Sequence, residues 1–130
     1  MTLILDTDVL IELYKGSRAV RDTIAGLLPL HPKNPAITFA NFSEFYYGIL
    51  GREEKEREKA LLFLDKFTLL NTTRASAKKF SELKYLLERA GKTIPILDIL
   101  IASLAMETKL TLLTMDKHFG KIEGLDVILL

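Results

Sequence analysis

The fold of this chain is decided by KTIPILDILIASLAMETKLTLLTMDKHF, residues 92–119, a stretch that sets two acids at opposite ends of one apolar unit. Apolar residues recur over 99–106 densely enough to predict a mostly buried helix, which Asp98 opens. After a break, residues 110–113 are predicted as a short strand buried on both faces, with Asp116 just beyond its carboxyl end. Ligands of open α/β sheets bind outside the carboxyl ends of the strands, so we expect both acids to face one cleft.

Short apolar runs alternate with helical patterns along the rest of the chain. Further strands are predicted at 2–5, 36–39, 67–70 and 126–130, and further helices at 9–14, 18–28, 41–50, in the charged stretch from 52 onward, and from 72 or 73 to 90. Apolar strands between helices are typical of a parallel sheet covered on both faces. We therefore predict the α/β class: a single domain over residues 1–130, built as an α/β/α sandwich around a parallel sheet of roughly five strands.

Local signals predict where these elements begin and end. Thr7 or Asp8 is expected to cap the first helix, and Asn41 with Glu44 has the spacing of a capping box. The charged run 52–59 is predicted as the exposed start of a helix that buries Leu61, Leu62 and Leu64; interaction with an acidic partner is the alternative. Prolines predict a loop at Pro29, Pro32 and Pro35.

The composition narrows the possible chemistry. Eighteen Lys and Arg against seventeen Asp and Glu leave a net charge of +1, so bulk charge does not indicate a nucleic-acid binder. Without cysteine the chain has no disulfide, no thiolate zinc site and no thiol nucleophile, and two histidines are too few for a His-rich metal centre. Any metal must therefore be held by oxygen ligands.

The sequence offers no targeting or membrane signal. Its start, MTLILDTD, lacks a basic region, carries an acid at Asp6, and has too short an apolar run for a signal peptide. No stretch approaches the roughly 18 uninterrupted apolar residues of a membrane span. We expect a cytoplasmic protein that does not contact the membrane.

Four acids sit where predicted strands end or the following helices begin: Asp6, Glu44, Asp98 and Asp116. Taken singly, each has a structural explanation as a helix cap, a strand end or a turn residue. Taken together, four acids at one edge of a parallel sheet would repel, by about 4 kcal/mol for two carboxylates ~4 Å apart at an effective dielectric of ~20. A hard cation removes that repulsion, and Mg²⁺ or Mn²⁺ prefers carboxylate and water oxygens. Phosphodiester hydrolysis is the chemistry that such a site favours.

Two neighbouring residues, Thr114 and His118, are weaker candidates for a role in the site. Thr114 is a candidate to orient a ligand carboxylate through its hydroxyl, although a strand-end threonine bonding the next turn fits the pattern equally well. His118 is a candidate phosphate contact, but a surface histidine beside Lys117 is the simpler interpretation. The aromatic group in 42–47 favours core or subunit-interface packing over base stacking.

Four segments resemble the successive acidic motifs of the PIN domain: LDTDVLIEL, SEFYYGIL, PILDILIASLA and LLTMDKHF. At this length the chain is similar to the toxin of a VapBC toxin–antitoxin pair. The resemblance implies a Mg²⁺- or Mn²⁺-dependent ribonuclease that acts on RNA, forms a homodimer and is inhibited by a small VapB-like antitoxin. By position it makes Asp6, Glu44, Asp98 and Asp116 the acidic site, with Asp6 and Asp98 the foremost metal ligands.

Asp8 departs from the family pattern, which often has Ser, Asn or Thr at this position. A fifth acid is therefore expected either near the metal or as a cap of the first helix. It also opens an alternative, because LILDTDVL fits the first motif of haloacid-dehalogenase-type phosphatases, with Asp6 as nucleophile and Asp8 as acid/base partner. That alternative leaves Glu44 and Asp98 without roles. A third possibility is a domain of the same fold that binds RNA or protein without catalysis.

Overall fold

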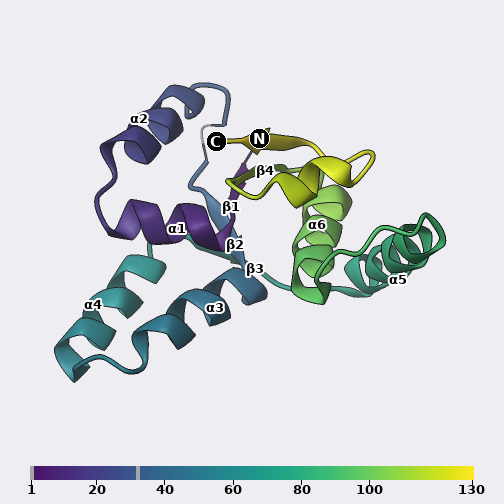
Figure 1. The fold of residues 1–130 in the computed structure, drawn as a ribbon. Coiled ribbons are helices and arrows are strands. Elements are labelled where there is room, and N and C mark those ends of the chain that lie inside the picture. The colour runs from purple at the N-terminus through teal and green to yellow at the C-terminus, as the bar shows by residue number, and fades with distance from the viewer. Residues whose placement is uncertain (1, 32) are drawn as a thin grey trace.

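The computed structural model describes residues 2–31 and 33–130, and it contains a five-stranded sheet in the order β3-β2-β1-β4-β5 (Figure 1). All four strand pairings are parallel, which confirms the predicted α/β class and parallel sheet. The strands are short: β1 (Leu3–Leu5), β2 (Ala36–Thr38), β3 (Thr68–Leu70), β4 (Thr111–Thr114) and β5 (Val127–Leu129).

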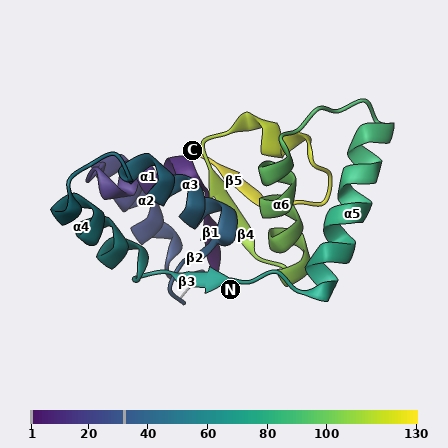
Figure 2. The ribbon, with the colours of Figure 1, turned by 90° about the horizontal axis from the view of Figure 1, so that it is seen from below.

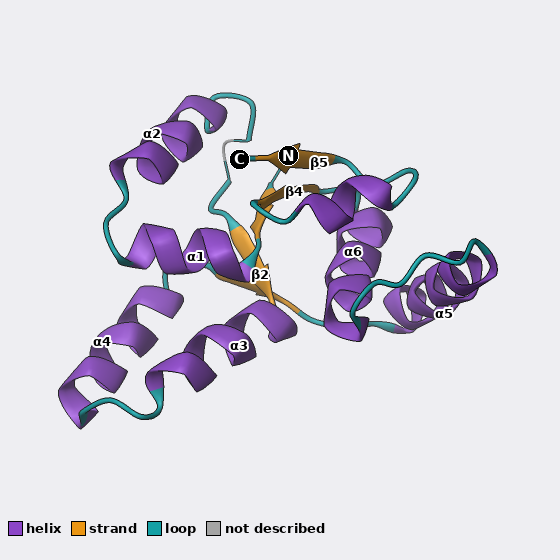
Figure 3. Ribbon diagram, in the orientation of Figure 1, coloured by secondary structure: helices purple, strands orange, loops and turns teal. Residues whose placement is uncertain are grey.

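Helices cover both faces of this sheet (Figure 3). Four lie on one side, α1 (Thr7–Tyr14), α2 (Arg18–Leu27), α3 (Phe39–Ile49) and α4 (Glu54–Leu64). On the other side lie α5 (Arg74–Arg89), α6 (Ile96–Thr108) and the short 3₁₀ helix η1 (Lys117–Lys121). Viewed along the edge in Figure 2, the two groups of helices are separated by the sheet, as expected for an α/β/α sandwich.

Alternating side chains of the central strands feed two separate cores. Ile4 and Leu112 are buried against α5 and α6, whereas Leu5 and Leu113 are buried against α1, α3 and α4. This alternation follows from the two-residue repeat of a β-strand, and it favours apolar residues at successive positions of a strand covered on both sides. The continuous apolar runs in the sequence are therefore explained by burial on both faces.

The middle of helix α6 lies in the interior, where residues 101–105 are all buried, whereas its first turn is exposed at Ile96 and Leu97. It begins at Ile96, with Pro95 in the capping position, so the prediction that Asp98 opens this helix is wrong by two residues. Proline suits this position because the amide hydrogen that it lacks would have no partner at a helix start. Asp98 instead lies in the first helical turn, where its charge favours the helix N-terminus.

Other boundaries also differ from the sequence predictions. Asp6, and neither Thr7 nor Asp8, caps α1. Helix α3 begins at Phe39, a residue predicted to end the preceding strand, and Thr38 is its cap. The capping box therefore joins Thr38 to Asn41 and does not join Asn41 to Glu44.

The outer parts of the chain are more exposed than their sequence suggests. Of the three leucines predicted to be buried by α4, only Leu64 is, because Leu61 and Leu62 are 37% and 69% exposed. Strand β3 lies at the edge of the sheet, and its burial is correspondingly low.

The predicted proline loop includes Pro32, which lies outside the described residues. No helix in the described part of the chain has both the length and the apolar character to cross a membrane.

The turn that joins α6 to β4 contains the one described non-glycine residue with a positive φ, Lys109 at φ 58°. Helix α5 ends in the same kind of turn, but with Gly91 at φ 69°. We predict that Lys109→Gly raises the free energy of unfolding by about 0.5–1 kcal/mol, since a left-handed backbone is strained for a residue with a Cβ. Gly91→Ala should lower it by a similar amount. Chemical denaturation measures both, and a less stable Lys109→Gly protein would contradict the strain.

Candidate functional site

The four acids singled out in the sequence lie towards the carboxyl edge of the sheet. Asp6 directly follows β1, and Asp116 comes two residues after β4. Glu44 lies in the second turn of α3, which follows β2, and Asp98 lies in the first turn of α6. Because α6 leads back to the start of β4, its first turn is at the same edge as the strand ends.

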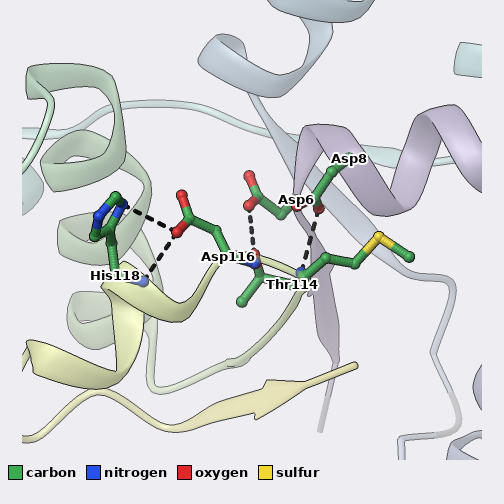
Figure 4. A network of polar contacts seen from close by, with 6 residues as sticks. Asp6, Asp8, Thr114, Asp116 and His118 are labelled. Atoms are coloured by element: carbon green, nitrogen blue, oxygen red, sulfur yellow. Dashed lines mark hydrogen bonds and ion pairs between the residues drawn. The ribbon is translucent and has the colours of Figure 1, made fainter.

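Asp6 is held in one orientation by three donors. Its Oδ1 accepts a hydrogen bond from the backbone N–H of Thr7 at 2.9 Å and from Nδ2 of Asn41 at 3.3 Å. Its Oδ2 accepts a hydrogen bond from the Thr114 hydroxyl at 2.6 Å (Figure 4). Asp6 is only 6% exposed, so these contacts replace most of the water that a carboxylate would otherwise bind.

Thr114 links Asp6 to the loop that carries Asp116 (Figure 4). Its Oγ1 accepts a hydrogen bond from the backbone N–H of Asp116 at 3.0 Å while its own hydrogen is donated to Asp6. Asp116 Oδ1 accepts from the backbone N–H of His118 at 2.9 Å and lies 3.1 Å from the Nδ1 of the same residue. The proposed orienting residue thus contacts a predicted site acid, and His118, an exposed residue as expected, contacts another.

Glu44 is reached through two residues that the sequence patterns assign to helix capping and not to the site. The Thr7 hydroxyl donates to Glu44 Oε1 at 2.8 Å, and Thr7 Oγ1 accepts from Asn41 Nδ2 at 3.2 Å. Asn41 is completely buried. A signal for both residues exists in the sequence, since each is a polar residue close behind a buried strand, but helix capping explains the same pattern.

The electrostatic state of the site shows that its acids influence one another. Burial raises the pKa of Asp6 to about 6, with Asp8 and Asp98 adding to the rise and the Thr114 and Thr7 hydrogen bonds opposing it. Burial also raises the pKa of Asp98 to about 6, and the charges of Asp116, Glu44 and Asp8 raise it further. Removal from water is therefore the main cause, and mutual repulsion is the second.

Asp8 is neither the cap of α1 nor a freely exposed side chain. Its Oδ1 accepts a hydrogen bond from the backbone N–H of Met115 at 3.4 Å, which ties α1 to the loop after β4 (Figure 4). Its pKa is raised, first by burial and then by the charge of Asp116, while the Met115 hydrogen bond opposes the rise. A fifth acid thus belongs to the same electrostatic neighbourhood.

The residues at this edge suit a hard divalent cation by their chemistry. Carboxylate and hydroxyl oxygens are the groups that Mg²⁺ and Mn²⁺ prefer, and the chain has no cysteine to favour a softer metal. Among residues 2–31 and 33–130, no three Asp, Glu or His side chains stand close enough together to hold one ion as they are placed. What fits the cation is therefore the donor set and its mutual repulsion, which a positive charge would relieve.

Solved structures of toxin–antitoxin systems share this fold over their full length. VapBC2 from Rickettsia felis, bound to a DNA fragment from its promoter, matches with 25% identity and a TM-score of 0.87, covering 100% of this chain and 99% of that chain. VapBC-1 from nontypeable Haemophilus influenzae matches with 22% identity and a TM-score of 0.86, covering 99% and 98%. VapC20 of Mycobacterium tuberculosis, described as a sarcin-ricin loop cleaving toxin, matches with 12% identity and a TM-score of 0.67, covering 97% and 98%.

No curated protein matches the chain in sequence. The family profile described as "PIN domain" matches residues 3–125, which is nearly the whole chain. This match includes every strand except the last and all four acids predicted from the sequence. The resemblance seen in the motifs is thereby confirmed, and the chain belongs to the PIN-domain family.

Proposed function

We propose that this protein is a metal-dependent endoribonuclease, the toxin of a toxin–antitoxin pair. The observation that carries the proposal is the group of partly buried acids at the carboxyl edge of a PIN-domain sheet, two of them with a pKa raised to about 6. Perturbed acids gathered in this way are a mark of functional sites. The charge repulsion among them gives a divalent cation a reason to bind.

In this proposal Asp6 and Asp98 are the principal cation ligands, and Glu44 and Asp116 complete the acidic site. A bound Mg²⁺ or Mn²⁺ supplies Lewis-acid stabilisation of charge at the phosphodiester. Thr114 orients Asp6 through its hydroxyl, so that one carboxylate oxygen is fixed by the protein. The Nδ1 of His118 contacts Asp116 Oδ1 and helps to orient this carboxylate.

The RNA substrate carries phosphates that the acids alone would repel. Glu44 also lines a cavity of about 490 Å³ between α1, α3 and α4, whose wall carries three cationic side chains, Lys15, Arg52 and Lys59, and one further acid, Glu56. The excess of cations over acids in this wall favours a polyanionic substrate. The description of VapC20 as a toxin that cleaves the sarcin-ricin loop supports RNA as the substrate class.

Two partners belong to the proposal. A small VapB-like antitoxin is expected to bind the toxin and block its groove, as the family resemblance implies. The structures of relatives described as VapBC support an antitoxin as the partner. A cavity between α5 and α6 is lined by apolar side chains that include Ile96 and Leu97. These two residues are 59% and 41% exposed, and such an exposed apolar surface supports a homodimer. Both partners and the RNA substrate would be met in the cytoplasm.

We expect the metal-supplemented protein to cleave single-stranded RNA and to lose at least about 100-fold in rate when Asp98 is replaced by Asn, since one ligand of the cation is then neutral. Asp8→Asn should retain most of the activity, because an Asn oxygen still accepts the Met115 hydrogen bond. Rates are measured on labelled RNA with Mg²⁺, with Mn²⁺ and with chelator.

The same assay with a phosphomonoester separates the alternatives. Phosphomonoester turnover that survives Asp98→Asn and disappears with Asp8→Asn would favour the phosphatase hypothesis, in which Asp6 and Asp8 form the site. Turnover of neither substrate would leave a domain that binds without catalysis. The match to the PIN family favours the ribonuclease over the phosphatase. The presence of acids at all four site positions favours it over a domain that binds without catalysis, because an unused group of like charges would only destabilise the fold.

Without a cation the acids should destabilise the fold. The raised pKa values of Asp6 and Asp98, about 6 against 3.8, mean that the folded protein holds protons which the unfolded chain has released, so stability falls as the pH rises from about 4 to about 6. In chelator at pH 7.5, Asp98→Asn should raise the free energy of unfolding by about 1 kcal/mol, since solvent screening and the helix N-terminus offset part of the shift.

Denaturant unfolding at pH 4 and pH 7.5 measures the difference in the free energy of unfolding between Asp98→Asn and wild type, which should be much smaller at pH 4, close to the unfolded-state pKa of 3.8. Asp22→Asn, at an exposed position in α2, is the control for a loss of one negative charge. A clear loss of stability in Asp98→Asn at pH 7.5 would show that Asp98 serves as a structural helix-end residue.

The proposed homodimer and the proposed antitoxin can each be tested in solution. Light scattering should give the mass of a dimer for the protein alone, and Ile96→Glu should shift it towards the monomer by placing a charge in the apolar contact. A small protein encoded beside this one should co-purify with it and suppress RNA cleavage. A monomer at micromolar concentration, unchanged by Ile96→Glu, would remove the dimer from the proposal.

A further inference from the structure

Asn41 uses every hydrogen-bonding position of its side chain although it is 0% exposed. Its Oδ1 accepts from the backbone N–H of Thr38 at 2.9 Å and from the Thr38 hydroxyl at 2.8 Å. Its Nδ2 donates to Asp6 Oδ1 at 3.3 Å and to Thr7 Oγ1 at 3.2 Å. A side-chain amide offers two acceptor positions and two donors, so this one is fully satisfied.

The orientation of this amide is determined by its surroundings. The backbone N–H of Thr38 can only donate, so the amide oxygen must face it and the amide nitrogen must face Asp6 and Thr7. Because Thr7 Oγ1 accepts from Asn41, its own hydrogen is available for Glu44 Oε1, which lies 2.8 Å away. The chain of donors therefore has one direction, from Thr38 through Asn41 and Thr7 to Glu44.

We propose, on the basis of the metal-dependent nuclease proposed above, that Asn41 is a positioning residue that fixes Asp6 and Glu44 relative to each other for cation binding. It bonds the first acid directly and the second through Thr7. It joins the residue that follows β1, Asp6, to the first turn of α3, the helix that follows β2 and carries Glu44. Being neutral, it orients both carboxylates without occupying the place of a cation.

The chemistry of the position explains why an amide is needed. Aspartate has the same shape but no donors, so Asn41→Asp would set a carboxylate against Asp6 and would draw the Thr7 hydroxyl away from Glu44. Thr7→Val removes the link to Glu44 and the acceptor of one Asn41 Nδ2 hydrogen, but it leaves the Asn41–Asp6 bond and the charge unchanged, whereas Thr7→Ser keeps the hydroxyl. Comparing these three variants separates the effects of charge, side-chain shape and hydrogen bonding on the two acids.

The first measurement is the side-chain amide spectrum of the metal-free, ¹⁵N-labelled protein. The chain has only three asparagines, Asn34, Asn41 and Asn71, and no glutamine, so three NH₂ pairs are expected. The other two residues are exposed. We expect one pair to be protected from solvent exchange, to shift on titration with Mg²⁺, and to change in Thr7→Val but not in Thr7→Ser.

The second measurement is the affinity for Mn²⁺, with the rate of RNA cleavage alongside. Asn41→Asp adds a negative charge close to the site, which by electrostatics alone should strengthen cation binding. If Asn41 positions the ligands, binding weakens instead, by roughly 10- to 100-fold, and kcat falls more than KM rises. Asn34→Asp makes the same chemical change at an exposed position before β2 and should leave both quantities unchanged.

Thr7→Val should weaken Mn²⁺ binding less than Asn41→Asp, and Thr7→Ser should restore the wild-type value. If the wild type binds Mn²⁺ and cleaves RNA, but Thr7→Val and Asn41→Asp bind as tightly as Asn34→Asp does, the positioning role is wrong while the nuclease stands. An Asn41 NH₂ pair that does not respond to saturating Mg²⁺ would likewise overturn the positioning role alone. A wild type that neither binds Mn²⁺ nor cleaves RNA would overturn the nuclease and the positioning role together.

Discussion

The structure depends on one electrostatic constraint, which is that several carboxylates converge in a place partly removed from water. Desolvation is the first cause of the raised pKa of Asp6 and of Asp98, and neighbouring acids add to it. Such a group of acids is unfavourable unless each negative charge is met by hydrogen-bond donors or by a cation. The fold supplies the donors, and the proposed function supplies the cation.

Topology brings about this convergence. Strands β1 and β4 are neighbours although one begins the chain and the other lies near its end, and their register pairs Leu5 with Leu113. The next residues on each strand are Asp6 and Thr114, so a hydrogen bond of 2.6 Å forms between residues 108 positions apart. Because all strands run the same way, each strand end adds its polar residues at the same edge. The acids are thus gathered by strand order, and their separation along the sequence does not matter.

The sequence is sufficient for the parts of the fold that depend on periodicity. Continuous apolar runs predict a parallel sheet buried on both faces, and that sheet is present. What cannot be predicted is which of two equivalent local patterns forms. Residues 38–41 and 41–44 both fit the spacing of a capping box, and the choice is made by where β2 ends, which its pairing with β3 sets through Thr38 and Leu70. The same ambiguity conceals the contact of Asn41 with Asp6, because a pairing between distant segments leaves no local signature.

The choice of compensating groups is consistent with a site kept for a cation. Lys or Arg would neutralise the acids most effectively, yet in the described part of the chain the ion pairs of Lys join it to Glu12, Glu82 and Glu88, away from the strand ends. Asp6 is instead met by an amide, a hydroxyl and a backbone N–H, and Glu44 by a hydroxyl. Neutral donors fix the direction of a carboxylate and leave most of its charge in place. A lysine among these acids would neutralise their charge and fill the space between them, whereas neutral donors leave the repulsion that, in the proposed function, a divalent cation relieves.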